Sequence, residues 1–139
     1  MKCMIILIGM FLCGSTAFGL DHYYLLRVST PQLVSSGAGI RMGQRSGQLR
    51  PTLQGDLGVG GGRILVGLDN TGESRFGHGL KAAILRSWLE PLSIDAGQTF
   101  MGLETEWSVR RLVVHAGGYR RISSGDDNWI FSTGLGFVF

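Results

Sequence analysis

The chain has 139 residues, 23 of them glycine, with 17% charged residues and a formal net charge of +3 at pH 7. This length allows one domain, and the low charge content with a mean hydropathy of +0.19 excludes a disordered polyelectrolyte. The glycines follow no three-residue period, which excludes a collagen-like chain, and no run of about 20 apolar residues predicts a membrane-spanning helix.

The first 19 residues have the three parts of a secretory signal peptide. Lys2 is the positive residue, Met4 to Leu12 form a short apolar stretch, and residues 14–17 are small. Cleavage after Ala17 or after Gly19 fits this pattern. An amino-terminal anchor helix is the alternative, but the apolar stretch is short for a membrane span. The sequence therefore predicts a signal peptide at residues 1–19 and one domain at residues 20–139.

Both cysteines, Cys3 and Cys13, lie in this leader. Phe11 and Leu12 are not the small residues that a lipoprotein has before its cysteine. The mature chain is therefore expected to have no disulfide, no thiolate metal site and no cysteine nucleophile. The glycine-rich stretch 58–63 does not complete a dinucleotide-binding motif, and no zinc-protease, EF-hand or phosphate-loop motif occurs. Neither a metal nor a cofactor is predicted.

The rest of the chain alternates apolar and polar residues in short segments separated by Gly, Pro, Asp and Asn, as β-strands do. The eight predicted strands are 21–29, 36–44, 50–58, 63–69, 77–88, 98–108, 110–122 and 128–139. Only 77–88 has a helical alternative, because Lys81 to Leu85 include good helix formers. Eight strands of about 9–11 residues suit a membrane barrel. The predicted fold is all-β, an eight-stranded antiparallel up-and-down transmembrane β-barrel.

The alternation gives each strand one apolar face and one face of charged and small residues. In the last strand, Trp129, Phe131 and Phe137 share the apolar face. A secreted lipocalin-like barrel would turn this face inward around a hydrophobic ligand and would need a highly charged exterior. The second face is instead rich in Gly, Ser and Ala with isolated charges, which suits a narrow lumen where glycines make room for paired Arg and Glu. An outward Trp129 and Phe137 would favour the membrane barrel, and inward ones the carrier.

The charged residues of the second face are predicted to form a nearly balanced network in the lumen, because an unpaired buried charge costs several kcal/mol. These residues are Arg27, Arg41, Asp56, Arg63, Asp69, Lys81, Glu104, Glu106, Arg111 and His115. A packing plug of salt bridges is the favoured role, and a narrow ion path is the alternative. The remaining arginines form no basic helix or stripe, so no nucleic-acid binding is predicted.

The carboxyl end, residues 132–139, resembles the assembly signal of bacterial outer-membrane β-barrels. A polar residue, a glycine and two aromatics occupy its four positions, as Ser132, Gly134, Phe137 and Phe139. The whole mature chain is similar in architecture to the small eight-stranded barrels of the OmpA/OmpX type. The resemblance implies an outer-membrane location, periplasmic termini and recognition of the last strand by the barrel-assembly machinery. This chain departs from the family in having only short loops.

The same resemblance implies contact with outer-membrane lipid and lipopolysaccharide. Arg86, Arg120 and Arg121 are candidates to meet lipid phosphates, because the guanidinium group forks onto phosphate. Asp126 and Asp127 could help to bridge divalent cations at the rim, although solvated rim charges are the simpler interpretation. The predicted function is a structural role or a weak surface interaction.

A third possibility is a barrel enzyme that modifies lipid A. A Ser-His hydrolase needs its nucleophile within hydrogen-bond reach of the histidine. A hairpin closing around residues 123–128 places His115 opposite Gly136. The same register places Ser132 opposite Tyr119, so that Ser132 and His115 do not meet, while Glu104 is expected near His115. The sequence at His115 also lacks the His-x-Ser pattern of the lipid A deacylase family. No catalytic residue is therefore predicted.

Overall fold

The computed structural model describes residues 19–43, 48–71, 75–90, 94–123 and 128–139. The predicted signal peptide lies outside these ranges except for Gly19, and so do the acidic pair Asp126 and Asp127. Within these ranges, no helix is long and apolar enough to cross a membrane.

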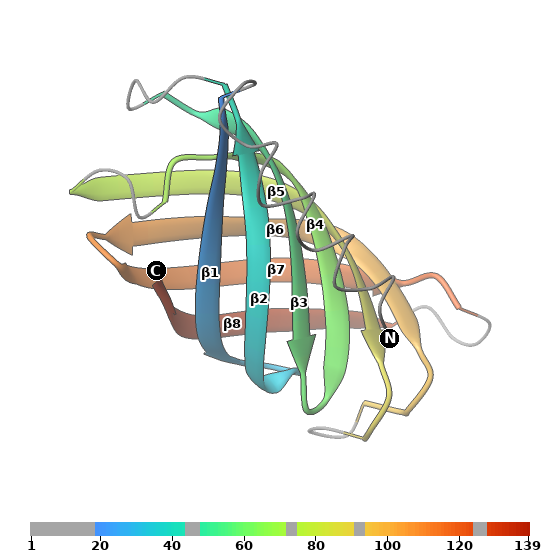
Figure 1. The fold of residues 1–139 in the computed structure, drawn as a ribbon. Helices are drawn as coiled ribbons and strands as arrows, with labels where there is room; N and C mark the ends of the chain where they lie inside the picture. The colour runs from blue at the N-terminus through green and yellow to red at the C-terminus, as the bar shows by residue number, and fades with distance from the viewer. Residues whose placement is uncertain (1–18, 44–47, 72–74, 91–93, 124–127) are drawn as a thin grey trace, which may run out of the picture.

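Eight strands follow one another along the chain and pair antiparallel in that order, and β8 returns to β1 to close a barrel (Figure 1). The strands are β1 (Leu20–Ser29), β2 (Leu33–Met42), β3 (Arg50–Gly58), β4 (Gly61–Asp69), β5 (Phe76–Ser87), β6 (Thr99–Val109), β7 (Leu112–Arg121) and β8 (Trp129–Val138). The predicted all-β, eight-stranded antiparallel barrel is confirmed. The helical alternative for 77–88 is wrong, because β5 pairs along its length with β4 and β6.

Three connections differ from the predicted ones: two are shorter, and the third is one residue longer. β2 begins at Leu33, three residues early, because the turn after β1 is short, and β4 begins at Gly61 rather than Arg63. Between β6 and β7, Val109 pairs with Leu112 and leaves a two-residue turn of Arg110 and Arg111. Arg110 lies there in the left-handed region, with φ of 56°, as tight hairpin turns require.

The closure of the barrel is strongly staggered. β1 pairs with β2 over ten residues but with β8 over only five, from Leu25 to Ser29. A stagger of this kind accompanies strongly tilted strands, and an eight-stranded barrel has an interior just wide enough for side chains to fill. Figure 1 shows the result, with β1 to β3 crossing β6 to β8 at a steep angle.

The two faces of every strand differ as the alternation predicts. Outward positions carry large exposed apolar side chains, among them Trp129, Phe131 and Phe137, which are 63%, 78% and 54% exposed. Inward positions carry most of the buried charged residues and two small apolar clusters. One cluster is Leu65, Ala83, Leu85, Phe100 and Tyr119, and the other is Tyr23, Leu25, Val113 and Val138.

The two ends of the barrel follow from the strand order. The connections β1–β2, β3–β4, β5–β6 and β7–β8 share one end, here called the loop end. The chain enters β1 and leaves β8 at the other end, the terminal end, which also holds the Arg110–Arg111 turn. The cluster around Phe100 lies toward the loop end and the cluster around Val138 toward the terminal end. The charged residues extend past the second cluster, because Arg41 is the cross-strand partner of Asp21, two residues nearer the terminal end than Tyr23.

Candidate functional site

Eight of the ten residues predicted for the lumen network meet there; Arg111 lies outside the lumen, and His115 is buried in it but forms no ion pair with the described residues. Four cations and four anions from strands β1 to β6 form one connected set of ion pairs, the lumen network. Its members are Arg27, Arg41, Asp56, Arg63, Asp69, Lys81, Glu104 and Glu106. Each is at most 3% exposed. The charges balance within this set, which offsets the large free-energy cost of removing charges from water.

Arg27 and Arg63 hold one half of the network. Arg27 donates to Glu104 over 2.9 Å and also contacts Glu106. Arg63 donates to Asp56 over 2.6 Å and contacts Glu104 from the opposite side. Glu104 thus lies between two guanidinium groups, and Arg27 reaches toward Asp56 at 3.8 Å. Charge-assisted hydrogen bonds of this geometry fix both side chains in place.

Lys81 joins this half to the other. Its ammonium lies 2.6 Å from Glu106 and 2.7 Å from Asp69. Asp69 in turn accepts from Arg41 over 2.6 Å, and Arg41 also donates to the carbonyl of Thr71 over 2.6 Å. The network therefore runs unbroken from β2 across the lumen to β6.

Three uncharged inward residues complete the network, and sequence analysis did not single them out. Gln54 accepts from Lys81 over 2.7 Å and from the Tyr23 hydroxyl over 2.8 Å, and it donates to Asp56 over 2.8 Å. Tyr119 donates to Glu104 over 2.6 Å. Their inward positions followed from the alternation. These residues were not predicted as members of the network because only charged residues were considered.

Arg50, also missed, is buried at the start of β3 near the terminal end. It donates to Asp21 and to the carbonyl of Gly43, over 3.1 Å in each case. Its place at the start of a predicted strand gave no indication of burial. It adds an ion pair close to the terminal end of the lumen.

The prediction that Arg111 belongs to the lumen network is wrong. Arg111 is exposed in the turn between β6 and β7. The predicted strand began two residues too early, at Arg110, because the turn was assigned to Val109 alone. Exposed arginines in a tight turn remain solvated, so this position adds no charge to the lumen.

Glycines lie directly across from the large side chains of the lumen. Gly37, Gly136 and Gly134 are the cross-strand partners of Asp56, Arg27 and His115, respectively. A Cβ added at Gly37 would lie 2.1 Å from Asp56 Oδ1, one at Gly136 2.8 Å from Arg27 Cγ, and one at Gly134 2.5 Å from His115 Cε1. At these three positions, glycine leaves room for a large side chain on the neighbouring strand, as predicted.

The predicted separation of Ser132 and His115 is wrong. The β7–β8 pairing places His115 opposite Gly134 and Ser132 opposite Gly117, which brings Ser132 Oγ within 3.5 Å of His115 Nε2. The carboxylate directly across from His115 is Glu106, and Glu104 faces Gly117. The difference arises because the hairpin closes around a point one residue earlier than assumed.

This Ser-His contact lacks the arrangement of a hydrolase. The Ser132 hydroxyl donates to the carbonyl of Thr30 rather than to the imidazole. His115 Nδ1 has no hydrogen-bond partner among the described residues, so no carboxylate orients the ring. Both side chains are 1% exposed and face the filled lumen. Nor do the described residues contain a group of three His, Cys, Asp or Glu side chains able to hold a metal ion.

The four residues of the carboxyl-terminal signal divide between the two faces of the last strand. Ser132 and Gly134 point inward, where Gly134 leaves room for His115. Phe137 and Phe139 point outward and are exposed. Recognition of this strand by assembly machinery stays a prediction.

The three arginines proposed for lipid phosphates occupy different settings. Arg86, near the end of β5, and Arg120, near the end of β7, are exposed at the loop end. Arg121 is half-buried, lies 3.7 Å from Asp95 and has its guanidinium 5.9 Å from the Phe100 ring centroid. Arg121 is therefore engaged by the protein itself.

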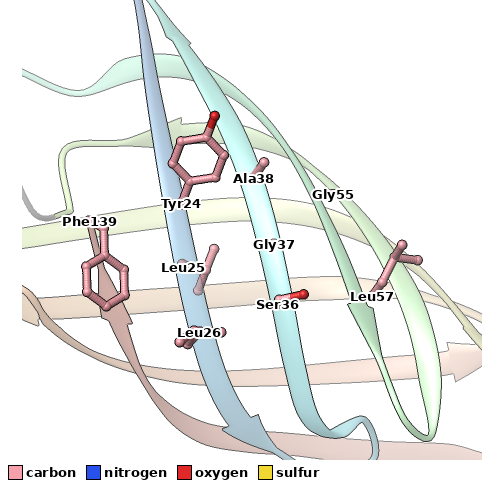
Figure 2. A pocket seen from close by; sticks show the side chains of 9 residues that line it. All are labelled: Tyr24, Leu25, Leu26, Ser36, Gly37, Ala38, Gly55, Leu57 and Phe139. Atoms are coloured by element: carbon pink, nitrogen blue, oxygen red, sulfur yellow. The ribbon is translucent and has the colours of Figure 1, made fainter. Parts of the chain in front are cut away.

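The outer wall carries three adjoining hollows that share Gly55 on β3. The largest, about 570 Å³, is drawn in Figure 2, where Tyr24 and Leu26 on β1 and Phe139 stand on one side and Leu57 on the other. Small side chains on β2 and β3 form its floor: Ser36, Gly37, Ala38 and Gly55. The wall is thus recessed where outward residues are small.

Comparison with known proteins identifies no relative: no protein-family model, no curated protein and no solved structure matches this chain.

Proposed function

We propose that this chain is a membrane β-barrel of the bacterial outer membrane, with a structural or weak surface-interaction role and no catalytic one. The observation that carries the proposal is the inverted polarity of the barrel. Large apolar side chains cover the outside, while the buried interior holds four cations and four anions in one network. A lipid bilayer is the solvent that favours this arrangement.

The filled lumen supports a structural role over a transport role. The network crosses the lumen from β2 to β6, and an apolar cluster lies toward each end of the barrel. An ion crossing the barrel would have to displace paired charges and pass both clusters. We therefore assign the network the function of an interior plug that stabilises the wall.

A secreted carrier of a hydrophobic ligand is the rival. It would need an apolar cavity inside the barrel and a polar exterior. Here the inward positions of β3, β5 and β6 bring Asp56, Lys81 and Glu106 to the centre, and the outward positions of β8 bring Trp129 and Phe137 to the surface. Both observations favour the membrane barrel.

Under this proposal the termini are periplasmic, the loop end faces outward, and the last strand with Phe137 and Phe139 is read by the assembly machinery. Lipopolysaccharide and outer-membrane lipid are then the neighbours of the apolar wall. We assign lipid-phosphate contacts to Arg86 and Arg120, which are exposed at the loop end.

Fractionation of the expressed protein with and without detergent, followed by gel electrophoresis of unboiled and boiled samples, tests the proposal. Recovery in the outer membrane with a mobility shift on boiling is the expected result. Recovery as a soluble periplasmic protein without detergent would overturn it and favour the carrier. Replacement of Phe137 and Phe139, which point outward, by serine is expected to block assembly, whereas a soluble carrier would tolerate it.

A further inference from the structure

One of the three hollows is lined by a tryptophan and an exposed arginine, Trp88 and Arg86, and the other two are lined by neither residue type. It has a volume of about 380 Å³, within the range of about 300–1,000 Å³ usual for ligand sites. Its walls are the outward side chains of Leu57, Ile64 and Ile84, and Gly55 and Gly62 leave it open. It lies on β3, β4 and β5 and extends toward the loop end. This hollow is named the β3–β5 groove.

Trp88 closes the groove at the loop end. Its indole Nε1 donates to the carbonyl of Val59 over 2.9 Å, which fixes the ring against the wall. The ring lies over Gly62, where an added Cβ would stand 2.7 Å from Cη2. A tryptophan with an apolar body and a polar edge belongs at the boundary between hydrocarbon and headgroups. The groove therefore ends at headgroup level if the wall faces lipid.

Arg86 lies beside this closed end. It is the cross-strand partner of Gly62 and lines the groove with Trp88. Arg120 and Arg121 have interactions within the protein. For Arg86, the described part of the chain offers no carboxylate within ion-pair distance. An exposed guanidinium at the end of an apolar groove is complementary to a molecule with a hydrocarbon chain and an anionic head.

We infer that the β3–β5 groove binds one acyl chain of a phosphorylated lipid, with the lipid phosphate on Arg86. This inference rests on the proposed membrane location. The groove supplies apolar contact for the chain, and Trp88 marks the depth at which the headgroup begins. Arg86 then supplies the paired N–H donors that a phosphate accepts.

Quenching of tryptophan fluorescence by brominated lipids tests the inference, because bromine quenches only from nearby. The protein is refolded into phosphatidylcholine vesicles as two variants, one retaining Trp88 alone and one retaining Trp107 alone. Trp107 is outward on β6 toward the terminal end and is 50% exposed, so it samples the wall away from the groove. The fluorescence of each variant is measured in vesicles that contain the same mole fraction of brominated phosphatidic acid, brominated phosphatidylcholine or brominated diacylglycerol.

At Trp88 we expect the quenching to show a preference of about fivefold for phosphatidic acid over phosphatidylcholine, because one arginine near an anionic lipid has an effect of this size. At Trp107 we expect no preference. Diacylglycerol, which lacks the phosphate, should show no preference. Arg86→Gln should remove the preference, and Gly55→Leu, which adds bulk where a Cβ meets nothing within 4 Å, should reduce it. Arg110→Gln and Ala82→Leu are the matched controls and should leave it unchanged.

Equal preference at Trp88 and Trp107, or a preference that survives Arg86→Gln, would overturn the groove while leaving the membrane barrel intact. Quenching of neither tryptophan by any brominated lipid would overturn the proposed function and the groove with it. The boiling-dependent mobility shift confirms that each variant is folded before it is compared.

Discussion

The inside and the outside of the same strand are specified in different ways. On β6, Glu104 and Glu106 point inward and each contacts particular atoms on other strands, whereas Leu103 and Trp107 point outward and are exposed. An inward substitution changes a defined set of partners. An outward one changes only the polarity of a surface. The interactions in the lumen therefore require particular residues, whereas the outer wall requires only that its residues be apolar.

The largest expected effect comes from breaking the lumen network. Glu104→Gln removes the negative charge between Arg27 and Arg63 and leaves excess positive charge buried. We expect a loss of about 3–5 kcal/mol in the free energy of unfolding, measured by urea titration in detergent micelles. Arg111→Gln, at an exposed turn position, is the control and should change stability by less than about 0.5 kcal/mol. Equal losses would show that the network does not stabilise the barrel.

A charge on the outer wall tests the other side of the comparison. Leu103→Arg lies midway along β6, where a bilayer would impose a cost of about 2–4 kcal/mol. Val109→Arg, at the last position of the same strand, should cost at most about 1 kcal/mol. Unfolding titrations in lipid vesicles measure both. If position along the strand made no difference, the wall would not be facing a bilayer.

Space in the lumen can be tested separately from charge. In Gly37→Ala the new methyl group would meet Asp56 Oδ1 at 2.1 Å and the Gly55 carbonyl at 2.8 Å. Overpacking of this kind should cost about 1–3 kcal/mol. Gly55→Ala, on the outward face of the next strand, meets nothing within 4 Å and should leave stability nearly unchanged. Comparable losses in both variants would show that crowding against Asp56 is not the cause.

The smallest effect is expected for the ion pair at the rim. Asp95 is 73% exposed and lies 3.7 Å from Arg121. Asp95→Asn should cost no more than about 1 kcal/mol, because solvent and salt screen an exposed pair. The loss should vanish in about 1 M salt, as urea titration at two salt concentrations would reveal. A loss as large as that of Glu104→Gln would remove the distinction between lumen and rim.

The period of two in the sequence was enough to predict which residues within a strand share a face. It placed Asp56 with Gln54 on one side of β3 and Leu53 with Leu57 on the other, as found. It could not give the register of β7 on β8, because a longer connection allows more than one closure and each choice moves every cross-strand partner. That is why the contact between Ser132 and His115 was missed.

Two further errors arose from local ambiguity. Arg111 was assigned to the lumen because nothing in Val109-Arg110-Arg111 shows whether a two-residue turn takes one arginine or both. Tyr23 and Tyr119 were passed over because an inward tyrosine on a mixed face is as consistent with packing as with a polar network. In both cases the missing information is three-dimensional: which backbone lies opposite, and at what distance.

The opposition of glycines and large side chains across neighbouring strands also limits how this chain can vary through evolution. The space available to each cross-strand pair is fixed for Gly37 with Asp56 and for Gly136 with Arg27. A larger residue at one position therefore requires a smaller residue at the other. Among descendants of this sequence, changes at these positions should be inherited in pairs, with glycine and the large residue trading places across the strands.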